Sequence, residues 1–521
     1  MLRKLRIILA TISFVLISLL FLDVSGLAHK WLSWMAEIQI VPAVLALNFG
    51  VLIVLAVLTF LFGRVYCSVI CPLGIMQDVI AWIPGRIKKK NKFRYSYTKE
   101  KKTLRVFIFA IFIAFLTSST LHTIGSLLEP YSIFGRIISN IFSPIYALGN
   151  NALAWVAERF NSYAFYSTEV WLPSLATLII AIVSFAILFV LAWKGGRTYC
   201  NTICPVGTFL GYISRYSIFV PVINSNACVS CKLCGKKCKS SCIDMENHEI
   251  DYSRCVMCMD CIDTCKEGAI KLSLRKGLKK NQTPNIKKTV EHIETQADIK
   301  TGTNQEKEID KKQESRRAFI ATSAIVATTA TLKAQEMKVD GGLAIIEDKK
   351  VPQRKTPLKP AGSQSLIHFN KNCTACQLCI DKCPNNVLRP STSLLNFMQP
   401  EMSYERGYCR PECTICSEVC PTNAIKPVTE EEKSSIKIGH AVVILENCVV
   451  NTDGVSCGNC AKHCPVGAIK MVKKDPDAEK SLRIPTVIEE RCIGCGACEF
   501  LCPARPFSAI IVEGHEVHRT N

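Results

Sequence analysis

The sequence is short of acidic residues, and long stretches of its first half have no charge. Its 521 residues hold 43 Asp and Glu against 63 Lys and Arg, which gives a formal net charge of +20. The basic excess belongs to residues 1–340, with 41 basic and 23 acidic groups, whereas residues 341–521 hold 22 and 20. One compact soluble domain is therefore excluded, and the charge points to a membrane surface.

Two kinds of binding signature are also absent. The basic residues line loops between apolar runs and form no recognition motif, which excludes a nucleic acid partner. The chain has no Met-rich or His-rich tract, so it lacks the usual signature of a metallochaperone.

Apolar runs near the N-terminus predict four membrane-spanning helices. Residues 40–62 and 171–193 are 23 uncharged residues each, and residues 5–22 and 104–121 are 18 each, with Arg6 and Arg105 near their starts. These lengths suffice to cross a hydrocarbon core of about 30 Å. A secretory signal is the alternative for the first run, but no small-residue cleavage site follows Leu22.

The distribution of Lys and Arg predicts the orientation. Residues 63–105 hold 11 of them, whereas residues 23–39 and 122–170 together hold three. Because basic loops stay in the cytoplasm, both ends of this four-helix domain are expected there. The outer segment carries a helical apolar stripe, which predicts either a helix lying on the outer face or packing against the bundle. The stripe consists of Phe134, Ile137, Ile138, Ile141, Phe142 and Ile145.

A motif of twelve residues occurs twice, after the second and after the fourth apolar run. Residues 63–74 read GRVYCSVICPLG and residues 196–207 read GRTYCNTICPVG, identical at eight positions. Two spans and one motif therefore form a duplicated unit, and two parallel copies would gather four cysteines at the cytoplasmic face. These can ligate an iron-sulfur cluster, act as redox-active thiols or pack as small apolar side chains. The four are Cys67, Cys71, Cys200 and Cys204.

A second cysteine pattern follows this domain, with the spacing of a ferredoxin that holds two 4Fe-4S clusters. A zinc site would leave half of these thiols without a role. Lys239 and Lys266 replace the usual proline, and the ninth cysteine leaves open whether Cys238 or Cys242 reaches across to the other cluster. The cysteines are Cys228, Cys231, Cys234, Cys238, Cys242, Cys255, Cys258, Cys261 and Cys265.

Sixteen further cysteines near the C-terminus form four runs, each ending in Cys-Pro, and predict four more 4Fe-4S clusters. Their ferredoxin spacing argues against structural disulfides. An Ala-Ile pair after the last cysteine, as at residues 269–270, 424–425 and 468–469, predicts a short closing strand. The runs are Cys373, Cys376, Cys379, Cys383; Cys409, Cys413, Cys416, Cys420; Cys448, Cys457, Cys460, Cys464; and Cys492, Cys495, Cys498, Cys502.

The segment between the two cysteine-rich regions has two parts. Residues 272–314 are rich in Lys, Glu, Gln and Thr, as is typical of a flexible linker. Residues 315–340 open with Ser-Arg-Arg-Ala-Phe before an Ala/Thr-rich apolar stretch. This pattern predicts an internal twin-arginine export signal, either retained as an anchor or cleaved. The alternative is a linker in which the Arg-Arg pair occurs by chance, but Phe319 and the apolar run favour the signal. That route exports folded proteins, which suits a domain whose clusters are inserted first.

These motifs together resemble two families. The spans, the two G-R-x-Y-C-x-x-x-C-P motifs and the two-cluster module resemble NapH, the membrane quinol dehydrogenase subunit of periplasmic nitrate reduction, with NosR and MauN as related families. The signal and four cluster runs resemble its exported partner NapG and the related MauM. The chain thus resembles a NapH–NapG fusion, although the Ser/Thr-Gly-Ala-Thr flavin motif of NosR is absent.

The predicted fold class is therefore multi-domain. It comprises an α-helical membrane bundle with four spans and an internal duplication, an α+β ferredoxin-like 2[4Fe-4S] module and an exported α+β four-cluster domain. Their bounds are 1–213, 214–271 and 341–521. The expected location is the bacterial inner membrane, with the N-terminus and first module cytoplasmic and the C-terminal domain periplasmic.

The resemblance implies an electron-transfer subunit of a quinol dehydrogenase. It would take electrons from the membrane quinone pool and pass them to a periplasmic reductase or cytochrome c, after export by the twin-arginine machinery. The cofactors would be six [4Fe-4S] clusters, or seven if the motif cysteines bind one, and quinol would be the substrate. His122, Glu129 and Asp23 are candidate proton acceptors. The alternative is an assembly or maintenance factor that keeps the metal centres of a periplasmic reductase reduced.

Overall fold

The computed structural model describes residues 2–23, 28–87, 95–118, 122–162, 164–168, 170–172, 174–275, 347–477 and 481–520. Residues 1–277 and 351–521 form one compact unit by their contacts, and the second unit spans Leu278–Lys350. Most of the predicted linker and the whole predicted export signal lie outside the described residues.

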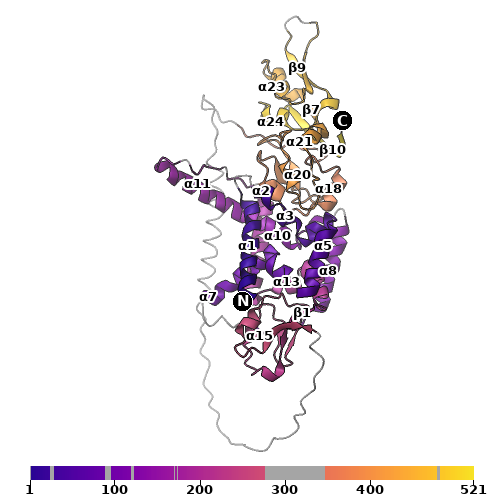
Figure 1. The fold of residues 1–521 in the computed structure, drawn as a ribbon. Helices are drawn as coiled ribbons and strands as arrows, with labels where there is room; N and C mark the ends of the chain where they lie inside the picture. The colour runs from indigo at the N-terminus through magenta and orange to yellow at the C-terminus, as the bar shows by residue number, and fades with distance from the viewer. Residues whose placement is uncertain are drawn as a thin grey trace, which may run out of the picture. The chain divides into compact units, whose positions relative to one another are not determined.

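The first part of the compact unit is helical, and we call residues 2–217 the helical domain (Figure 1). Its helices are α1 (Leu2–Leu22), α2 (Ala28–Leu32), α3 (Trp34–Glu37), α4 (Ile40–Leu45), α5 (Phe49–Phe62), α6 (Tyr66–Val69), α7 (Pro72–Ile87), α8 (Lys102–Thr117), α9 (His122–Gly125), α10 (Pro130–Ile137), the π-helix η2 (Ile138–Phe142), α11 (Ser143–Arg159), α12 (Leu175–Gly195), α13 (Thr198–Thr202) and α14 (Pro205–Ser214).

Among the described residues, α1 and α12 are long and apolar enough to cross a membrane, each with 21 residues. The prediction of one continuous helix over residues 40–62 is wrong, because the chain breaks between α4 and α5. Leu47 takes a positive φ of 55°, and the Asn48 side chain caps α5 by accepting a hydrogen bond from the Val51 amide at 3.3 Å. The helix predicted over residues 104–121 has 16 residues, as α8.

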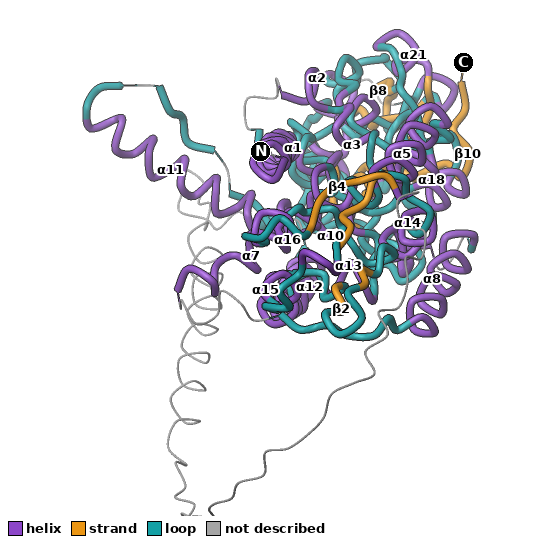
Figure 2. The backbone as a smooth tube through the Cα atoms, turned by 60° about the horizontal axis from the view of Figure 1, so that its bottom comes forward, coloured by secondary structure: helices purple, strands orange, loops and turns teal. Residues whose placement is uncertain are grey.

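The apolar stripe of the outer segment packs against the bundle in its first half. Phe134, Ile137 and Ile138 are buried, and the Phe134 ring lies 5.8 Å from that of Phe14 in α1. Ile145 and most of α11 are exposed, and α11 stands apart from the other helices in both views (Figures 1 and 2). The packing interpretation therefore holds for α10 and η2 and not for α11.

The first module folds around two paired strands, one from its beginning and one from its end. Strand β1 (Phe219–Ile223) pairs antiparallel with β4 (Ile270–Leu274), so that β4 continues past Lys271, where the module was predicted to end. Between them lie the 3-10 helix η3 (Ser225–Ala227), α15 (Leu233–Lys237), β2 (Ile243–Asp244), β3 (Glu249–Ile250) and α16 (Asp260–Thr264).

The C-terminal domain, residues 347–520, is made of short helices and two-stranded sheets, drawn in purple and orange in Figure 2. Strand β7 (Ile436–Val443) pairs with β10 (Ile510–Thr520), β8 (Ile469–Lys473) with β9 (Arg483–Val487), and β5 (Leu388–Pro390) with β6 (Pro400–Met402). The Ala-Ile pair opens a strand at Ile270 and Ile469 but not at Ile425. The helices are α18 (Leu366–Asn372), α19 (Leu378–Asp381), α20 (Ile415–Glu418), α21 (Glu430–Ser435), η5 (Leu445–Asn447), α22 (Val449–Thr452), α23 (Asn459–Lys462), η6 (Glu489–Arg491) and α24 (Ala497–Leu501).

Candidate iron-sulfur centres

Cysteine runs with the C-x-x-C-x-x-C spacing share one backbone conformation. The residues on both sides of the second cysteine take positive φ, as Ser230 (52°) and Lys232 (58°) do around Cys231. The same pair of turns recurs around Cys258, Cys376 and Cys495. The left-handed residues on either side of the second cysteine curl the loop, so that three thiols of one run face one small space.

The thiols of the first module gather in two sets that each draw on both runs. Cys228, Cys231 and Cys234 line one cavity together with Cys265 from the second run. Cys255, Cys258 and Cys261 line another together with Cys238 and Cys242. This crossed arrangement is that of a two-cluster ferredoxin.

The structure brings both open candidates, Cys238 and Cys242, to the same cavity. Their sulfur atoms lie 3.6 Å apart, and Cys242 is almost fully buried. The hydrogen bond with Cys242 outweighs burial and lowers the pKa of Cys238 to about 7. Both sulfur atoms therefore stand at the second set, and the pKa of Cys238 is the lower of the two.

The C-terminal domain crosses its thiols in the same way. Cys373, Cys376, Cys379 and Cys420 line one cavity, which we call the Cys373 set. Cys383 lies within electrostatic range of Cys409 and Cys416, whose run also holds Cys413. Two further cavities are lined by Cys448, Cys457, Cys460 and Cys502, and by Cys464, Cys492, Cys495 and Cys498.

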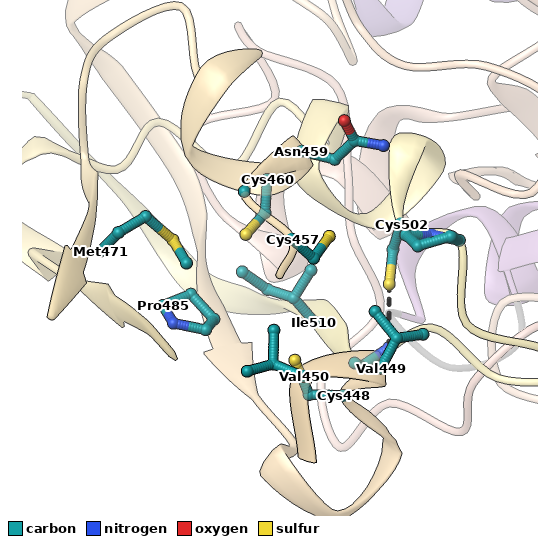
Figure 3. A pocket seen from close by; sticks show the side chains of 13 residues that line it. Cys448, Val449, Val450, Cys457, Asn459, Cys460, Met471, Pro485, Cys502 and Ile510 are labelled. Carbon is teal, nitrogen blue, oxygen red and sulfur yellow. Dashed lines mark hydrogen bonds between the residues drawn. The ribbon is translucent and has the colours of Figure 1, made fainter. Parts of the chain in front are cut away.

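Figure 3 shows one of these cavities, with the sulfur atoms of Cys448, Cys457, Cys460 and Cys502 around a common space. The Cys502 sulfur accepts a hydrogen bond from the Ala509 amide at 3.3 Å. Backbone amides also donate to Cys383, Cys420 and Cys464. Such bonds favour the thiolate form and tune the potential of a bound cluster.

Burial disfavours the thiolate form of these cysteines when no metal is bound. It raises the pKa of Cys373 and of Cys416. Among the described residues, no three His, Cys, Asp or Glu side chains stand close enough to hold a single ion. The donor set, four sulfurs around a space larger than one ion needs, fits a cubane cluster and not zinc.

The four motif cysteines of the helical domain are also buried and lie at a site with reciprocal hydrogen bonds. Arg64 donates to the carbonyl oxygen of Cys200 at 3.0 Å, and Arg197 donates to that of Cys67 at 2.6 Å. Each guanidinium also lies within 4.0 Å of the thiol of its own copy. Each motif thus binds the backbone of the other.

Glycines in the motifs make this close approach possible. A Cβ atom on Gly74 would collide with the carbonyl oxygen of Cys67, and one on Gly207 with that of Cys200. Cys204 caps α14, because its sulfur accepts a hydrogen bond from the Gly207 amide at 3.3 Å. The Gln77 amide donates to Cys200 at 3.2 Å. The sequence offered Arg64 and Arg197 as repeated residues, but their crossed roles needed the fold.

Charged residues join the first module to this site. Asp78 forms ion pairs with Arg6, with Arg197 at 2.8 Å and with Lys239 at 3.6 Å. Burial opposes ionisation of Asp78, but these three cations outweigh it and hold its pKa well below the usual value. Lys239, which replaces the proline of ordinary ferredoxins, also pairs with Asp260 at 3.2 Å.

The three predicted proton acceptors all lie near the first run of the C-terminal domain. The Glu129 carboxylate caps α10 by accepting from the amides of Tyr131 and Ser132. The Asp23 carboxylate accepts from the Ala28 amide at 2.8 Å, and its carbonyl accepts from Lys382. His122 is buried, and burial lowers its pKa to about 4. Two of the three therefore have structural roles.

Two family descriptions match the chain. The family described as a 4Fe-4S binding domain matches residues 44–91 and 177–223, which hold the two motifs. The family described as a 4Fe-4S dicluster domain matches residues 408–468 and 455–505. Both descriptions agree with the chemistry of the thiol sets.

The relatives align with somewhat less than half of this chain. They include the ferredoxin-type protein NapH of Escherichia coli (26% identity, 45% of this chain and 70% of NapH). The methylamine utilization ferredoxin-type protein MauN of Methylobacillus flagellatus is 23% identical over 45% of this chain and 71% of its own. An uncharacterized protein of Methanocaldococcus jannaschii is 24% identical over 42% and 69%. No solved structure matches. The chain is an iron-sulfur electron-transfer protein with 4Fe-4S binding domains.

Proposed function

We propose that the chain oxidises quinol in the bacterial inner membrane and passes single electrons to a periplasmic reductase or cytochrome c, as the NapG and NapH families together would. Each quinol gives up two electrons and two protons and leaves as quinone. The ferredoxin-type relatives and the crossed thiol sets support this role, because a row of such sites conducts electrons without atom transfer.

Six of the thiol sets would hold 4Fe-4S clusters, which supply one-electron redox chemistry when bound. Two lie in the first module, on Cys228, Cys231, Cys234 and Cys265, and on Cys238, Cys255, Cys258 and Cys261. Four lie in the C-terminal domain, on the sets described above. The chain's own residues supply the thiolates, and the backbone amides orient them.

The observation that carries this function is that the motif site contacts the first module while the outer segment contacts the C-terminal domain. Arg64 donates to the Ser253 carbonyl at 3.1 Å, and Asn201 donates to the Ser240 carbonyl at 3.0 Å, both in the first module. Tyr199 of the motif donates to the Leu128 carbonyl at 2.9 Å, in the outer segment. A membrane core of about 30 Å is too thick for one electron transfer, and an intermediate site removes that difficulty.

We propose a seventh centre on Cys67, Cys71, Cys200 and Cys204. Arg64 is fully buried and has no carboxylate partner among its hydrogen-bond acceptors, so an anionic centre would balance its charge. The Cys67→Ser/Cys200→Ser double variant is expected to lose four irons per chain relative to wild type. Unchanged iron content would favour redox thiols or packing instead.

The same contacts agree with the proposed topology. The first module contacts the basic, cytoplasmic ends of the motifs, and the C-terminal domain contacts the segment between the third and fourth apolar runs. The export signal at residues 315–340 would carry the C-terminal domain across. Reporter fusions after Arg275 and after Asn521 are expected to be active in the cytoplasm and in the periplasm, respectively. Two cytoplasmic fusions would contradict this topology.

Reduction by quinol tests the activity directly. Anaerobically purified full-length protein is mixed with a menaquinol or ubiquinol analogue, and visible absorbance and electron paramagnetic resonance (EPR) follow the clusters. We expect reduction by the analogue. Clusters that stay oxidised with quinol but respond to dithionite would refute the function.

Of the predicted proton acceptors, His122 fits best. Its ring is buried beside the backbone of Cys373, whereas the carboxylates of Glu129 and Asp23 cap backbone amides. A His122→Gln variant is expected to reduce the quinol reaction while leaving reduction by dithionite unchanged.

A deletion strain distinguishes the electron-transfer role from the alternative role in assembly or maintenance. Under the electron-transfer proposal, the terminal reductase is fully metallated in that strain but receives no electrons. A reductase that lacks its metal centres would favour the alternative.

A further inference from the structure

Helix α10 of the helical domain packs against the cysteine loop of one thiol set in the C-terminal domain, the Cys373 set. Helix α10 presents Arg136, whose guanidinium donates to the carbonyl of Ala375 at 3.4 Å, between Cys373 and Cys376. Gly135 faces the same loop so closely that a Cβ atom would collide with the carbonyl oxygen of Cys376. The helix therefore lies directly on the loop that carries these thiols.

The contact continues along the same run. Asn140 donates to the Gln377 side chain at 2.6 Å, and Ser139 donates to Asp381 at 2.8 Å. Lys382 donates in return to the Asp23 carbonyl at 2.8 Å, at the end of α1. Hydrogen bonds with both α10–η2 and α1 thus fix residues 375–382.

Two buried cations flank the Cys373 set. Arg136 is 1% exposed, and its Nε has no hydrogen-bond partner. Lys359 is 2% exposed, donates to the Pro400 carbonyl at 3.1 Å and lies 4.7 Å from the centre of the Phe369 ring. Neither forms an ion pair with a carboxylate among the described residues, and Glu129 and Glu401 act on Arg136 and Lys359 only at longer range. An anionic centre on the four thiols would add a further negative charge beside both cations.

The opposite end of α10 leads to the motif cysteines. Arg136 donates to the Ser126 carbonyl at 2.9 Å, and Tyr199, the neighbour of Cys200, donates to the carbonyl of Leu128 at 2.9 Å. The helix also packs on α7 and α12, which follow the first motif and precede the second. A packed and hydrogen-bonded route therefore runs from Cys200 to the Cys373 loop.

We propose that the Cys373 set is the port through which the C-terminal domain exchanges electrons with the helical domain, and that Arg136 is its positioning residue. With clusters bound at both sites, one electron would pass from the motif site to the port, so that the motif site is oxidised and the port reduced by one electron each. The remaining three sets of the C-terminal domain would then receive electrons through the port. The direction of electron flow rests on the proposed function, whereas the contacts between α10 and the Cys373 loop do not.

The first test is a potentiometric titration of the anaerobic full-length protein, followed by EPR and independent of quinol. In Arg136→Gln, one cluster signal of the C-terminal domain is expected to shift to lower potential, because a buried positive charge is lost. Arg136→Lys restores the charge and should restore most of the potential. Arg159→Gln, at an exposed residue of α11, is the matched control and should shift nothing. No shift in Arg136→Gln, or equal shifts in several signals, would overturn the proposal.

The second test concerns order. Rapid-freeze EPR after mixing with a quinol analogue should show the Arg136-sensitive signal reduced before the other three. Gly135→Ala pushes the Cys373 loop away and should slow all four by about tenfold or more, while the first module is reduced at the wild-type rate. Gly149→Ala, where a Cβ meets nothing within 4 Å, is the control. If another cluster of the C-terminal domain is reduced first in the wild type, the Cys373 set is not the port. A wild type that quinol does not reduce at all contradicts the proposed function and leaves the titration to decide the port.

Discussion

The two motif segments share eight of twelve residues, yet their arginines are neutralised differently. Arg197 makes two hydrogen bonds to Asp78, at 2.9 and 2.8 Å. Arg64 instead bonds the Asn201 side chain at 2.9 Å and the Ser253 carbonyl at 3.1 Å. The position in the second copy that corresponds to Asp78 is Gly211, where a Cβ would collide with the Arg105 guanidinium.

Two similar motifs can therefore lie in surroundings of unequal charge. The first copy gives its partner arginine a carboxylate, which that arginine shares with Arg6 and Lys239. On the other side, the positive charge of Arg64 faces Cys67 and Cys200 without a carboxylate. A buried cation in that position favours thiolates, and so the asymmetry favours an anionic centre.

Removing the Asp78 carboxylate should have the largest effect on stability. In Asp78→Asn, three cations lose their common partner, and breaking a buried ion pair costs about 3–5 kcal/mol. Thermal unfolding of the solubilised full-length protein measures this loss. Asp263→Asn, at an exposed partner of Arg3, is the control and should cost below about 1 kcal/mol. Equal effects at both positions would contradict the role of Asp78.

The lysine that replaces proline in the first module should have the next largest effect. Lys239→Met removes the cation shared by Asp78 and Asp260, with an expected loss of about 1.5–3 kcal/mol. Lys266→Met occupies the corresponding place after the second run, where the side chain is exposed, and should change little. Thermal unfolding of the two variants side by side gives the answer, and a larger loss for Lys266→Met would be inconsistent with our interpretation.

The two motif glycines, unlike the two arginines, are expected to contribute equally to stability. Gly74→Ala and Gly207→Ala each place a Cβ against a cysteine carbonyl, and overpacking of this kind costs about 1–3 kcal/mol. Gly85→Ala, with nothing within 4 Å of its Cβ, is the control. Unfolding measurements that show a loss in one copy alone would mean that the crossed contacts are not equivalent.

The smallest effect concerns pH. Because the folded-state pKa of Asp78 is lowered, its contribution to stability is present above the ordinary Asp pKa of about 3.9 and disappears as pH falls through the lower folded value. The difference in thermal midpoint between wild type and Asp78→Asn should therefore stay constant from about pH 8 to 5 and shrink only below about pH 4. A difference that vanished near pH 6 would argue against this assignment.

The sequence predicted what depends on local spacing. Runs such as Cys373 to Cys383 indicated ferredoxin loops, because two turns and three thiols are encoded within a few residues. The apolar run at residues 171–193 likewise predicted a helix that the structure has as α12, two to four residues further along. The break at Leu47 was missed, because the positive φ occurs at a leucine inside an uncharged run.

Features that depend on distant residues could not be predicted. The contact of Arg136 with Ala375 joins residues 239 positions apart, and no periodicity signals it. The role of Lys239 was visible as a departure from the ferredoxin pattern, but its partners come from α7 and α16. Which thiol of one run joins another set, as with Cys420 and Cys502, also required the fold.

The exchange of thiols between runs has a consequence for maturation. Since each cavity takes three sulfurs from one run and one or two from another, inserting iron and sulfide at either end closes both loops at once. A partly loaded polypeptide would keep cysteine loops that no metal holds in place. Loading of one cluster would therefore order parts of two runs and couple the assembly of neighbouring clusters.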